Sequence, residues 1–210
     1  MKMFYVLVAL LLLVLSPVKL MAFDEIDIYF GAYAQGSIPS DSNKHIQSNG
    51  ESVQRSSVHG GLGGGIKIGL FPDLTKRMVG IEFEYGGHSV DMGFQQAGGM
   101  SRSRADVIIL QSTVNLLFRY PHKILRPYVG IGAGSSSGIL IGASIDGRRD
   151  KSIESAMAFT HQFLAGVHSS VSQKVYLFGE WKYVSANYHW KALSVDYRSQ
   201  SILGGVGFQF

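Results

Sequence analysis

The feature that most constrains this chain is a two-residue alternation that begins at Ile108 and continues to Tyr120. Nearly every second position is apolar in the series Ile108, Leu110, Ser112, Val114, Leu116, Phe118 and Tyr120, in which Ser112 is the exception. The positions between them are mostly polar. Such a period predicts a β-strand with one apolar and one polar face. After Pro121 a second alternation places Val129, Ile131 and Ala133 on one face and Tyr128, Gly130, Gly132 and Gly134 on the other. These strands exceed the usual length of about five or six residues and match the roughly nine to eleven of a tilted transmembrane strand.

The first residues have the pattern of a secretory signal peptide. Lys2 supplies the positive charge, residues 4–15 form an apolar run, and Pro17 ends it. A run of about twelve residues is too short to span a bilayer. We therefore expect residues 1–22 to be the signal peptide and residues 23–210 to form a single domain, because no linker or change in composition divides them.

The composition fits an exported barrel. The chain has no cysteine, only 16% charged residues against a usual value of about 25%, and 26 glycines. Without Lys2 and Lys19, the 19 basic residues fall to 17, against 15 acidic ones, so the charge does not indicate a nucleic-acid partner. The mature chain has no apolar stretch of about 18 residues, so we expect no transmembrane helix.

The alternation divides the chain into eight expected strands. They cover residues 25–36, 58–70, 78–90, 105–120, 126–141, 156–169, 174–188 and 197–210. Their connections alternate between mostly long polar loops (37–57, 91–104, 142–155 and 189–196) and short turns (71–77, 121–125 and 170–173). This alternation is typical of a bacterial outer-membrane barrel, and eight strands would place both termini at the periplasmic, short-turn end. The predicted fold is an all-β, eight-stranded antiparallel up-and-down transmembrane β-barrel.

A soluble, lipocalin-like barrel also alternates, but it directs its apolar face inward. Three features favour the membrane form. The polar faces carry glycines, as at Gly61, Gly63, Gly65 and Gly69, which suit a narrow lumen. The chain ends within its last strand. Aromatic residues gather near strand ends, as two interfacial girdles would: Phe71, Phe118, Tyr120, Tyr128, Tyr176, Phe178 and Phe208 at one end, and Tyr85, Phe94, Tyr188 and Trp190 at the other.

Three patches resemble a known family. They are residues 115–121 (NLLFRYP) with residues 126–134 (RPYVGIGAG), residues 178–183 (FGEWKY) and residues 207–210 (GFQF). They resemble the fourth-to-fifth-strand hairpin, the seventh strand and the final strand of the OmpA-like and opacity-type outer-membrane β-barrel family. The resemblance implies that Phe208 and Phe210 form the signal read by the outer-membrane assembly machinery. It also implies a barrel without a periplasmic peptidoglycan-binding domain.

Seven charged residues occupy inward positions by alternation, and we predict that they form a charge network in the lumen: Asp27, Lys67, Glu82, Glu84, Arg119, Glu180 and Lys182. Charges facing lipid near the bilayer midplane cost roughly 2–4 kcal/mol, so inward placement is favoured. Two interpretations remain open. The charges form either a salt-bridged plug, which we favour because an eight-stranded interior is just wide enough for side chains, or a gated, narrow ion path.

An enzyme that modifies lipid A is a less favoured alternative, and we expect that the protein is not an enzyme. A deacylase would need a His–Ser pair with a carboxylate on the lipid-facing side near the outer leaflet. His168 with Ser169 and Ser170 lies near a short turn, and His88, next to Ser89, faces inward with Glu84. Alternation places His161 outward. No metal site is predicted from the scattered histidines, and the GxGxxG-like run 59–65 lies in a strand without a following helix, so no cofactor is expected.

The remaining expectations concern location and partners. We expect an outer-membrane protein with a structural or surface-interaction role, with a pore for ions or small apolar solutes, as in OmpW-type barrels, as the alternative. The expected partners are outer-membrane lipid, lipopolysaccharide and the assembly machinery, and the chain is expected to be a monomer. Basic residues in the outer loops would help to hold lipid A phosphates, or simply form a solvated surface: Lys44, His45, Arg55, Arg102, Arg104, Arg148, Arg149 and Lys151.

Overall fold

The computed structural model describes residues 26–40, 46–48, 51–52, 55–95, 102–145, 148–189 and 193–210. Side chains are described for residues 26–40, 60–90, 107–139, 155–189 and 196–210. The predicted signal peptide, residues 1–22, lies outside the described residues. The same is true of the side chains of the eight basic loop residues and of Phe94 and Trp190.

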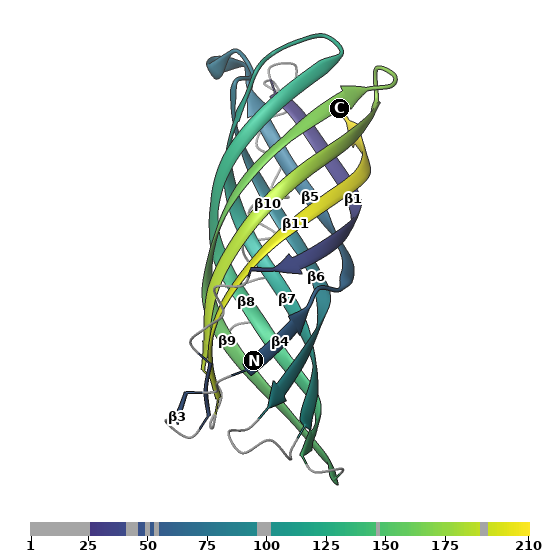
Figure 1. The fold of residues 1–210 in the computed structure, drawn as a ribbon. Coiled ribbons are helices and arrows are strands. Elements are labelled where there is room, and N and C mark those ends of the chain that lie inside the picture. Colours follow the sequence, from purple (N-terminus) through teal and green to yellow (C-terminus); the bar gives the residue numbers. More distant parts are fainter. Residues whose placement is uncertain are drawn as a thin grey trace, which may run out of the picture.

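Eight long strands form a closed antiparallel cylinder (Figure 1). They are β1 (Ile26–Pro39), β5 (Leu62–Pro72), β6 (Val79–Gln95), β7 (Arg102–Arg119), β8 (Leu125–Ile145), β9 (Arg148–Ser170), β10 (Val175–His189) and β11 (Leu193–Gln209). Each pairs with the next, and β1 pairs with β11 to close the cylinder, from Tyr29 opposite Gln209 to Pro39 opposite Ser199. The predicted eight-stranded up-and-down barrel is confirmed.

Three short strands are added near one end of the cylinder. They are β2 (Ile46–Ser48), which pairs with β11, β3 (Glu51–Ser52), which pairs with β2, and β4 (Arg55–His59), which pairs with β6. The predicted strand 58–70 is therefore divided, because Gly60 and Gly61 interrupt it. A Cβ at Gly60 would lie only 1.7 Å from the Ser37 carbonyl oxygen, so the close approach of β1 requires glycine there.

The two ends of the barrel differ in their connections. Short turns at residues 120–124 and 171–174, and the single 3₁₀ turn η2 (Asp73–Thr75), lie at the upper end of Figure 1, near the C-terminus. We call this the turn end, and the opposite end the loop end. Among the described residues, no helix is long and apolar enough to cross a membrane.

At the loop end the strands are longer than the alternation predicted. Residues 142–145 and 148–155, expected in a loop, continue the β8–β9 ladder, and β6 and β7 continue to Gln95 and Arg102. The expectation of long loops at 91–104, 142–155 and 189–196 is therefore wrong for most of these residues. An alternation of apolar and polar residues identifies a strand only where one face of the strand is apolar. Strand segments beyond the apolar band are not detected in this way.

The orientation of the two faces excludes the lipocalin-like arrangement. On β6, Ile81 and Phe83 are exposed at 55% and 44%, whereas Glu82 and Glu84 between them are buried at 1% and 4%. On β7 and β8, Val114, Phe118, Val129 and Ile131 are exposed, whereas Asn115 and Arg119 are buried. The apolar face of each strand thus points out of the cylinder, as the alternation predicted.

Five of the predicted girdle aromatics are placed differently. Phe71, Tyr128, Tyr176, Phe178 and Tyr188 are all buried in the lumen. The girdle prediction was wrong for them because it used only nearness to a strand end, whereas their parity directs them inward. Tyr85, Phe118, Tyr120 and Phe208 are exposed as predicted.

The inward aromatics fit because glycines face them. A Cβ at Gly69 would lie 2.5 Å from the Tyr29 ring, and one at Gly207 would lie 2.3 Å from the Tyr176 ring. Large and small residues therefore alternate across the narrow interior, which is the packing that a small barrel requires.

Candidate functional site

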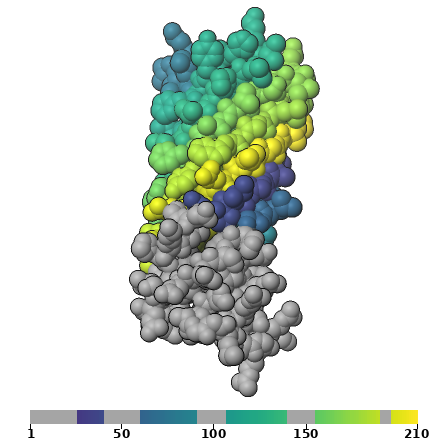
Figure 2. All heavy atoms as spheres, in the orientation of Figure 1, coloured from purple at the N-terminus to yellow at the C-terminus, as the bar shows by residue number. Residues whose placement is uncertain are grey.

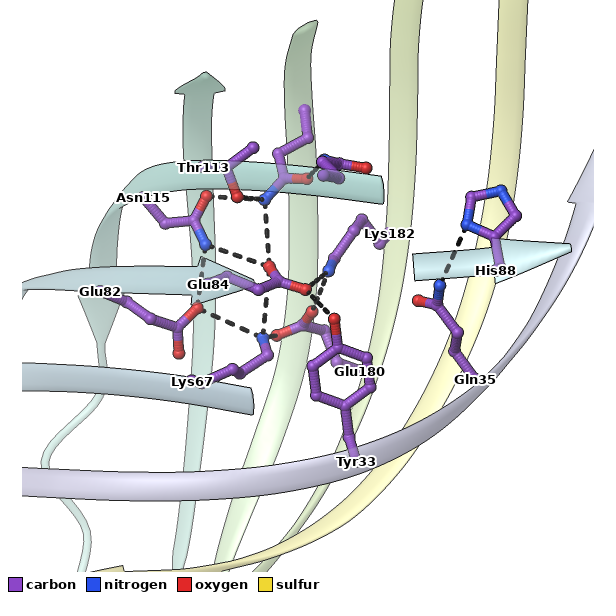
Figure 3. A network of polar contacts seen from close by, with 12 residues as sticks. Tyr33, Gln35, Lys67, Glu82, Glu84, His88, Thr113, Asn115, Glu180 and Lys182 are labelled. Carbon is purple, nitrogen blue, oxygen red and sulfur yellow. Dashed lines mark hydrogen bonds and ion pairs between the residues drawn. The ribbon is translucent and has the colours of Figure 1, made fainter. Parts of the chain in front are cut away.

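The centre of the lumen holds a cluster of five buried charges, which we call the central cluster: Lys67, Glu82, Glu84, Glu180 and Lys182. Lys67 comes from β5, the first two glutamates from β6, and Glu180 and Lys182 from β10 (Figure 3). All five occupy inward positions of their strands because residues of the same parity share one face. Three acids face two bases.

Ion pairs connect the whole central cluster. The Nζ atom of Lys67 lies 2.7 Å from Glu180 Oε2, 3.2 Å from Glu82 Oε1 and 3.9 Å from Glu84 Oε2. Lys182 donates a hydrogen bond to Glu84 and lies 3.6 Å from Glu180 Oε1. Each lysine therefore bridges carboxylates of different strands.

Tyrosine hydroxyls compensate for the additional acid. Each glutamate accepts one such hydrogen bond: Glu82 from Tyr29 at 2.6 Å, Glu84 from Tyr33 at 2.6 Å and Glu180 from Tyr128 at 2.7 Å. Hydrogen bonds to ionised groups are stronger than neutral ones, so these phenols stabilise negative charge that two lysines alone do not balance. Within the described residues, Glu180 Oε1 is left without a hydrogen-bond donor.

Amide side chains of β7 and β9 also bind the central cluster. Asn115 donates to Glu82 Oε1 at 2.9 Å, and Gln162 donates to Asn115 Oδ1 at 2.7 Å. Gln111 donates to Gln162 at 2.7 Å. Residues Tyr29, Tyr33, Tyr128, Asn115 and Gln162 were not predicted as site residues, although the inward parity of each would have indicated it.

Asp27 and Arg119, the other two predicted network residues, form a separate group at the turn end. An Nη atom of Arg119 lies 2.7 Å from Asp27 Oδ2, and its guanidinium lies 3.6 Å from the centre of the Phe71 ring. Arg126 lies 3.6 Å from the same carboxylate and donates to Ser170 and Gln209. The structure therefore places the seven predicted charges in the lumen but in two groups.

Along the barrel axis, an aromatic layer lies between the central cluster and the Asp27–Arg119 group. His168 is at its centre, with ring centroids 4.5 Å from Tyr128, 4.9 Å from Tyr176 and 5.6 Å from Tyr29. The layer therefore places packed aromatic rings between the two charge groups.

The half of the lumen toward the loop end is less charged, but it is still polar. His88 shares hydrogen bonds with Gln35 at 3.2 Å and Tyr197 at 2.8 Å (Figure 3 shows the first). Farther along the strands, buried aliphatic residues (Val90, Val107, Ile109, Ala156, Ala158 and Ala186) lie among buried hydroxyl groups. Tyr188 donates a hydrogen bond to Ser136 at 2.6 Å, and Ser37 and Ser199 share one at 2.7 Å.

Little space remains beside the central cluster. A cavity lined by Tyr33, Gln35, Glu84, His88 and Lys182, among others, has a volume of about 10 Å³. This volume is about the minimum that one water molecule needs.

The predicted His–Ser candidates do not form a lipid-facing site. His88 and His168 are both buried in the lumen. His161 is exposed on the outer surface, as alternation predicted, and lies opposite Ser185 of β10. Within the described residues, no group of three or more His, Cys, Asp or Glu side chains is arranged to hold a metal ion.

The closed cylinder, its apolar outer face and its charged interior define an integral membrane β-barrel. A family model described as an outer membrane protein beta-barrel domain matches residues 7–210. The chain belongs to this family, and it is therefore an outer-membrane protein.

Two solved structures with the same fold are similar to this chain. OprG from Pseudomonas aeruginosa has a TM-score of 0.55 and 16% identity, over 89% of this chain and 96% of that one. Neisserial surface protein A has a TM-score of 0.51 and 15% identity, over 87% of this chain and 97% of that one. At such low identity the likeness shows the fold alone. No curated protein matches the sequence.

Proposed function

We propose that this protein is a closed barrel that presents its loop end at the cell surface, where its role is structural or one of surface interaction. The closed lumen is the observation that carries the proposal. The central cluster, the aromatic layer and the Asp27–Arg119 pair occupy successive levels of the interior, and the cavity of about 10 Å³ is too small for a hydrated ion.

The length of the strands supports a role at the surface. With a rise of about 3.3 Å per residue and a tilt of about 40°, the 23 residues of β9 extend roughly 55–60 Å along the barrel axis. The apolar band of an outer-membrane barrel is only about 25 Å tall. The β8–β9 hairpin therefore projects well beyond the membrane, where it can meet partners.

The orientation can be tested because the chain contains no cysteine. Single cysteines replace Ser144 near the loop end and Lys174 in the β9–β10 turn. A membrane-impermeant maleimide added to intact cells should label S144C but not K174C, and both variants should react after lysis. Labelling of K174C alone in intact cells would refute the proposed orientation, in which both termini are periplasmic.

The closed lumen is tested by planar-bilayer recordings. We expect no steady single-channel openings from the wild-type barrel. Steady openings whose size changes in Glu84→Gln or Lys182→Met, at equal folded protein, would instead support an ion pore.

A second candidate function, passage of small apolar solutes, has one observation in its favour. One wall of the lumen toward the loop end carries the aliphatic side chains of Val90, Val107 and Ile109, which would accept an apolar molecule. Uptake of an apolar dye into proteoliposomes, measured against protein-free liposomes, tests it; an equal rate contradicts it.

We also propose that the protein is not an enzyme, which the burial of His88 and His168 supports. Mass spectrometry of lipid A from overexpressing cells should show an unchanged structure.

A further inference from the structure

The outer surface of β9 carries one histidine among large apolar side chains. Four successive outward residues, which we call the β9 ridge, are Met157, Phe159, His161 and Phe163. All four are exposed, and Met157 and Phe159 reach 77% and 70%. Part of this face, with β9 and β10 in green beside β11 in yellow, is visible in Figure 2. The ridge is therefore directed at the surroundings of the barrel in the membrane.

His161 lies within the apolar stripe of β9 and not at its edge. Apart from His161, the outward residues from Met157 to Val167 are apolar, and these ten steps correspond to about 25 Å along a tilted strand. This is the height of the apolar band of an outer-membrane barrel. His161 follows Met157 by four residues, so its imidazole lies about 10 Å inside the loop-end edge of the stripe. Hydrocarbon at that depth offers no hydrogen-bond partner.

No other histidine or charged residue has such a position on the described outer surface. Among outward residues of the eight long strands whose side chains are described, the histidines and charged residues are His161, His189, Asp196 and Arg198. The last three follow other polar outward residues along β10 and β11 and belong to the polar loop-end surface, whereas apolar residues lie on both sides of His161. Ionisable side chains facing hydrocarbon are rare and indicate a functional contact.

The chain itself does not satisfy this imidazole. The direct cross-strand neighbours of His161 are Ala133 of β8 and Ser185 of β10. In the described part of the chain, His161 takes part in no hydrogen bond or ion pair. An imidazole has two ring nitrogens, so the Ser185 hydroxyl could bond to only one of them. The other nitrogen needs a partner from outside the chain.

A row of small residues on β8 lies beside the β9 ridge. Ser137, Ser135 and Ala133, which we call the β8 row, pair with the first three residues of the ridge. Two copies inserted in the same direction are related by a twofold axis along the membrane normal. An axis between β8 and β9 brings the ridge of each copy onto the β8 row of the other, with the tilted strands crossing. The face is therefore complementary to itself in shape.

We propose that the β8–β9 face binds a second copy of this chain within the membrane, and that His161 of each copy hydrogen-bonds with a serine of the β8 row of the other. An imidazole donates and accepts, and a hydroxyl does both, so two identical bonds form without any net charge at the interface. A dimer thus replaces the monomer expected from the sequence. The inference holds whichever end of the barrel faces the cell surface.

The test measures association of the refolded barrel in phosphatidylcholine vesicles. Because the chain contains no cysteine, a Lys174→Cys change in the β9–β10 turn can carry a donor or an acceptor dye. Energy transfer between copies, followed over a range of protein-to-lipid ratios, gives the mole fraction of half association. Ser135→Phe places a ring where the second copy docks and should raise this mole fraction about tenfold. The matched control, Ala32→Phe, is also an exposed small-to-large change, on β1 across the barrel, and should leave it unchanged.

The variant His161→Leu separates hydrogen bonding from apolar adhesion. Leucine is more favourable than histidine in hydrocarbon, so the monomer should fold normally, as reported by the mobility of unheated samples in electrophoresis. Loss of the paired imidazoles should raise the mole fraction of half association severalfold. Unchanged or tighter association of His161→Leu would overturn the inference, and this variant decides the question even if Ser135→Phe does not refold.

Cross-linking in the outer membrane identifies the partner. Phe159→Cys, treated with a short bis-maleimide, should give a product of twice the monomer mass, whereas Ile66→Cys on the far side of the barrel should not. A product of another size alone would mean a different partner and would overturn the assignment to a second copy. Wild-type protein that remains monomeric at every protein-to-lipid ratio would do the same. These results do not depend on the cysteine-labelling experiment, which tests only the orientation.

Discussion

Replacement of Lys67 by methionine is the sharpest test of the lumen. Lys67 is only 2% exposed and contacts three carboxylates at 2.7, 3.2 and 3.9 Å. Its loss leaves Lys182 as the only cation among Glu82, Glu84 and Glu180. A unit-charge pair at about 4 Å contributes roughly 4 kcal/mol at an effective dielectric constant of about 20, and desolvation of the ions offsets much of the sum. We therefore expect Lys67→Met to lower the free energy of unfolding by about 3–5 kcal/mol.

The double variant Lys67→Met with Glu180→Gln should be more stable than the single one by about 1–2 kcal/mol, because it removes a carboxylate that has lost its partner. The control is Asp73→Asn, which breaks the Asp73–Arg77 pair at 3.0 Å, where both side chains are about half exposed. That change should cost less than about 1 kcal/mol.

The assay is urea unfolding of the barrel refolded in lipid vesicles, followed by tryptophan fluorescence. Two results would refute the reasoning: a Lys67→Met variant within about 1 kcal/mol of wild type, or a double variant no more stable than the single one. Either result would mean that water, not the lysine, compensates the carboxylates.

Two further predictions concern packing and assembly. Gly69→Ala should destabilise the barrel by about 1–3 kcal/mol in the same assay, because its Cβ would lie 2.5 Å from the Tyr29 ring, whereas Gly204→Ala, with nothing within 4 Å, should be tolerated. Phe210→Ala should lower the amount of folded protein in the outer membrane severalfold, as measured by heat-modifiable mobility, yet leave refolding in detergent unchanged; normal levels in cells would contradict a role of Phe210 as an assembly signal.

The sequence predicted the barrel and the faces of its strands because both follow from the exclusion of charged side chains from hydrocarbon. Charges such as Glu82 and Lys182 are expensive in hydrocarbon, so parity alone placed them in the lumen. Parity could not predict which charges form ion pairs with one another. That Lys67 lies 2.7 Å from Glu180, on strands far apart in the chain, depends on the stagger of the closed cylinder, which alternation does not encode.

The misplaced aromatics have another origin, because the girdle prediction did not use their parity. Tyr128 and Tyr176 contact His168 because glycines on neighbouring strands leave space for their rings. Parity would have placed each ring inward, but only the register reveals which glycine faces which ring. Likewise Ala133, His161 and Ser185 are far apart in sequence, and only the pairing of β8, β9 and β10 makes them neighbours.

The pairing of β1 with β11 has a consequence for synthesis and quality control. Tyr29 pairs with Gln209, and the Phe210 amide donates to the Ile28 carbonyl at 2.8 Å, so the first and last long strands of the barrel bond to each other. A product truncated during translation would keep two edge strands with unpaired amide and carbonyl groups. Such edges pair readily with other chains. Such fragments cannot settle into a smaller version of the native protein, and we expect periplasmic proteases to remove them.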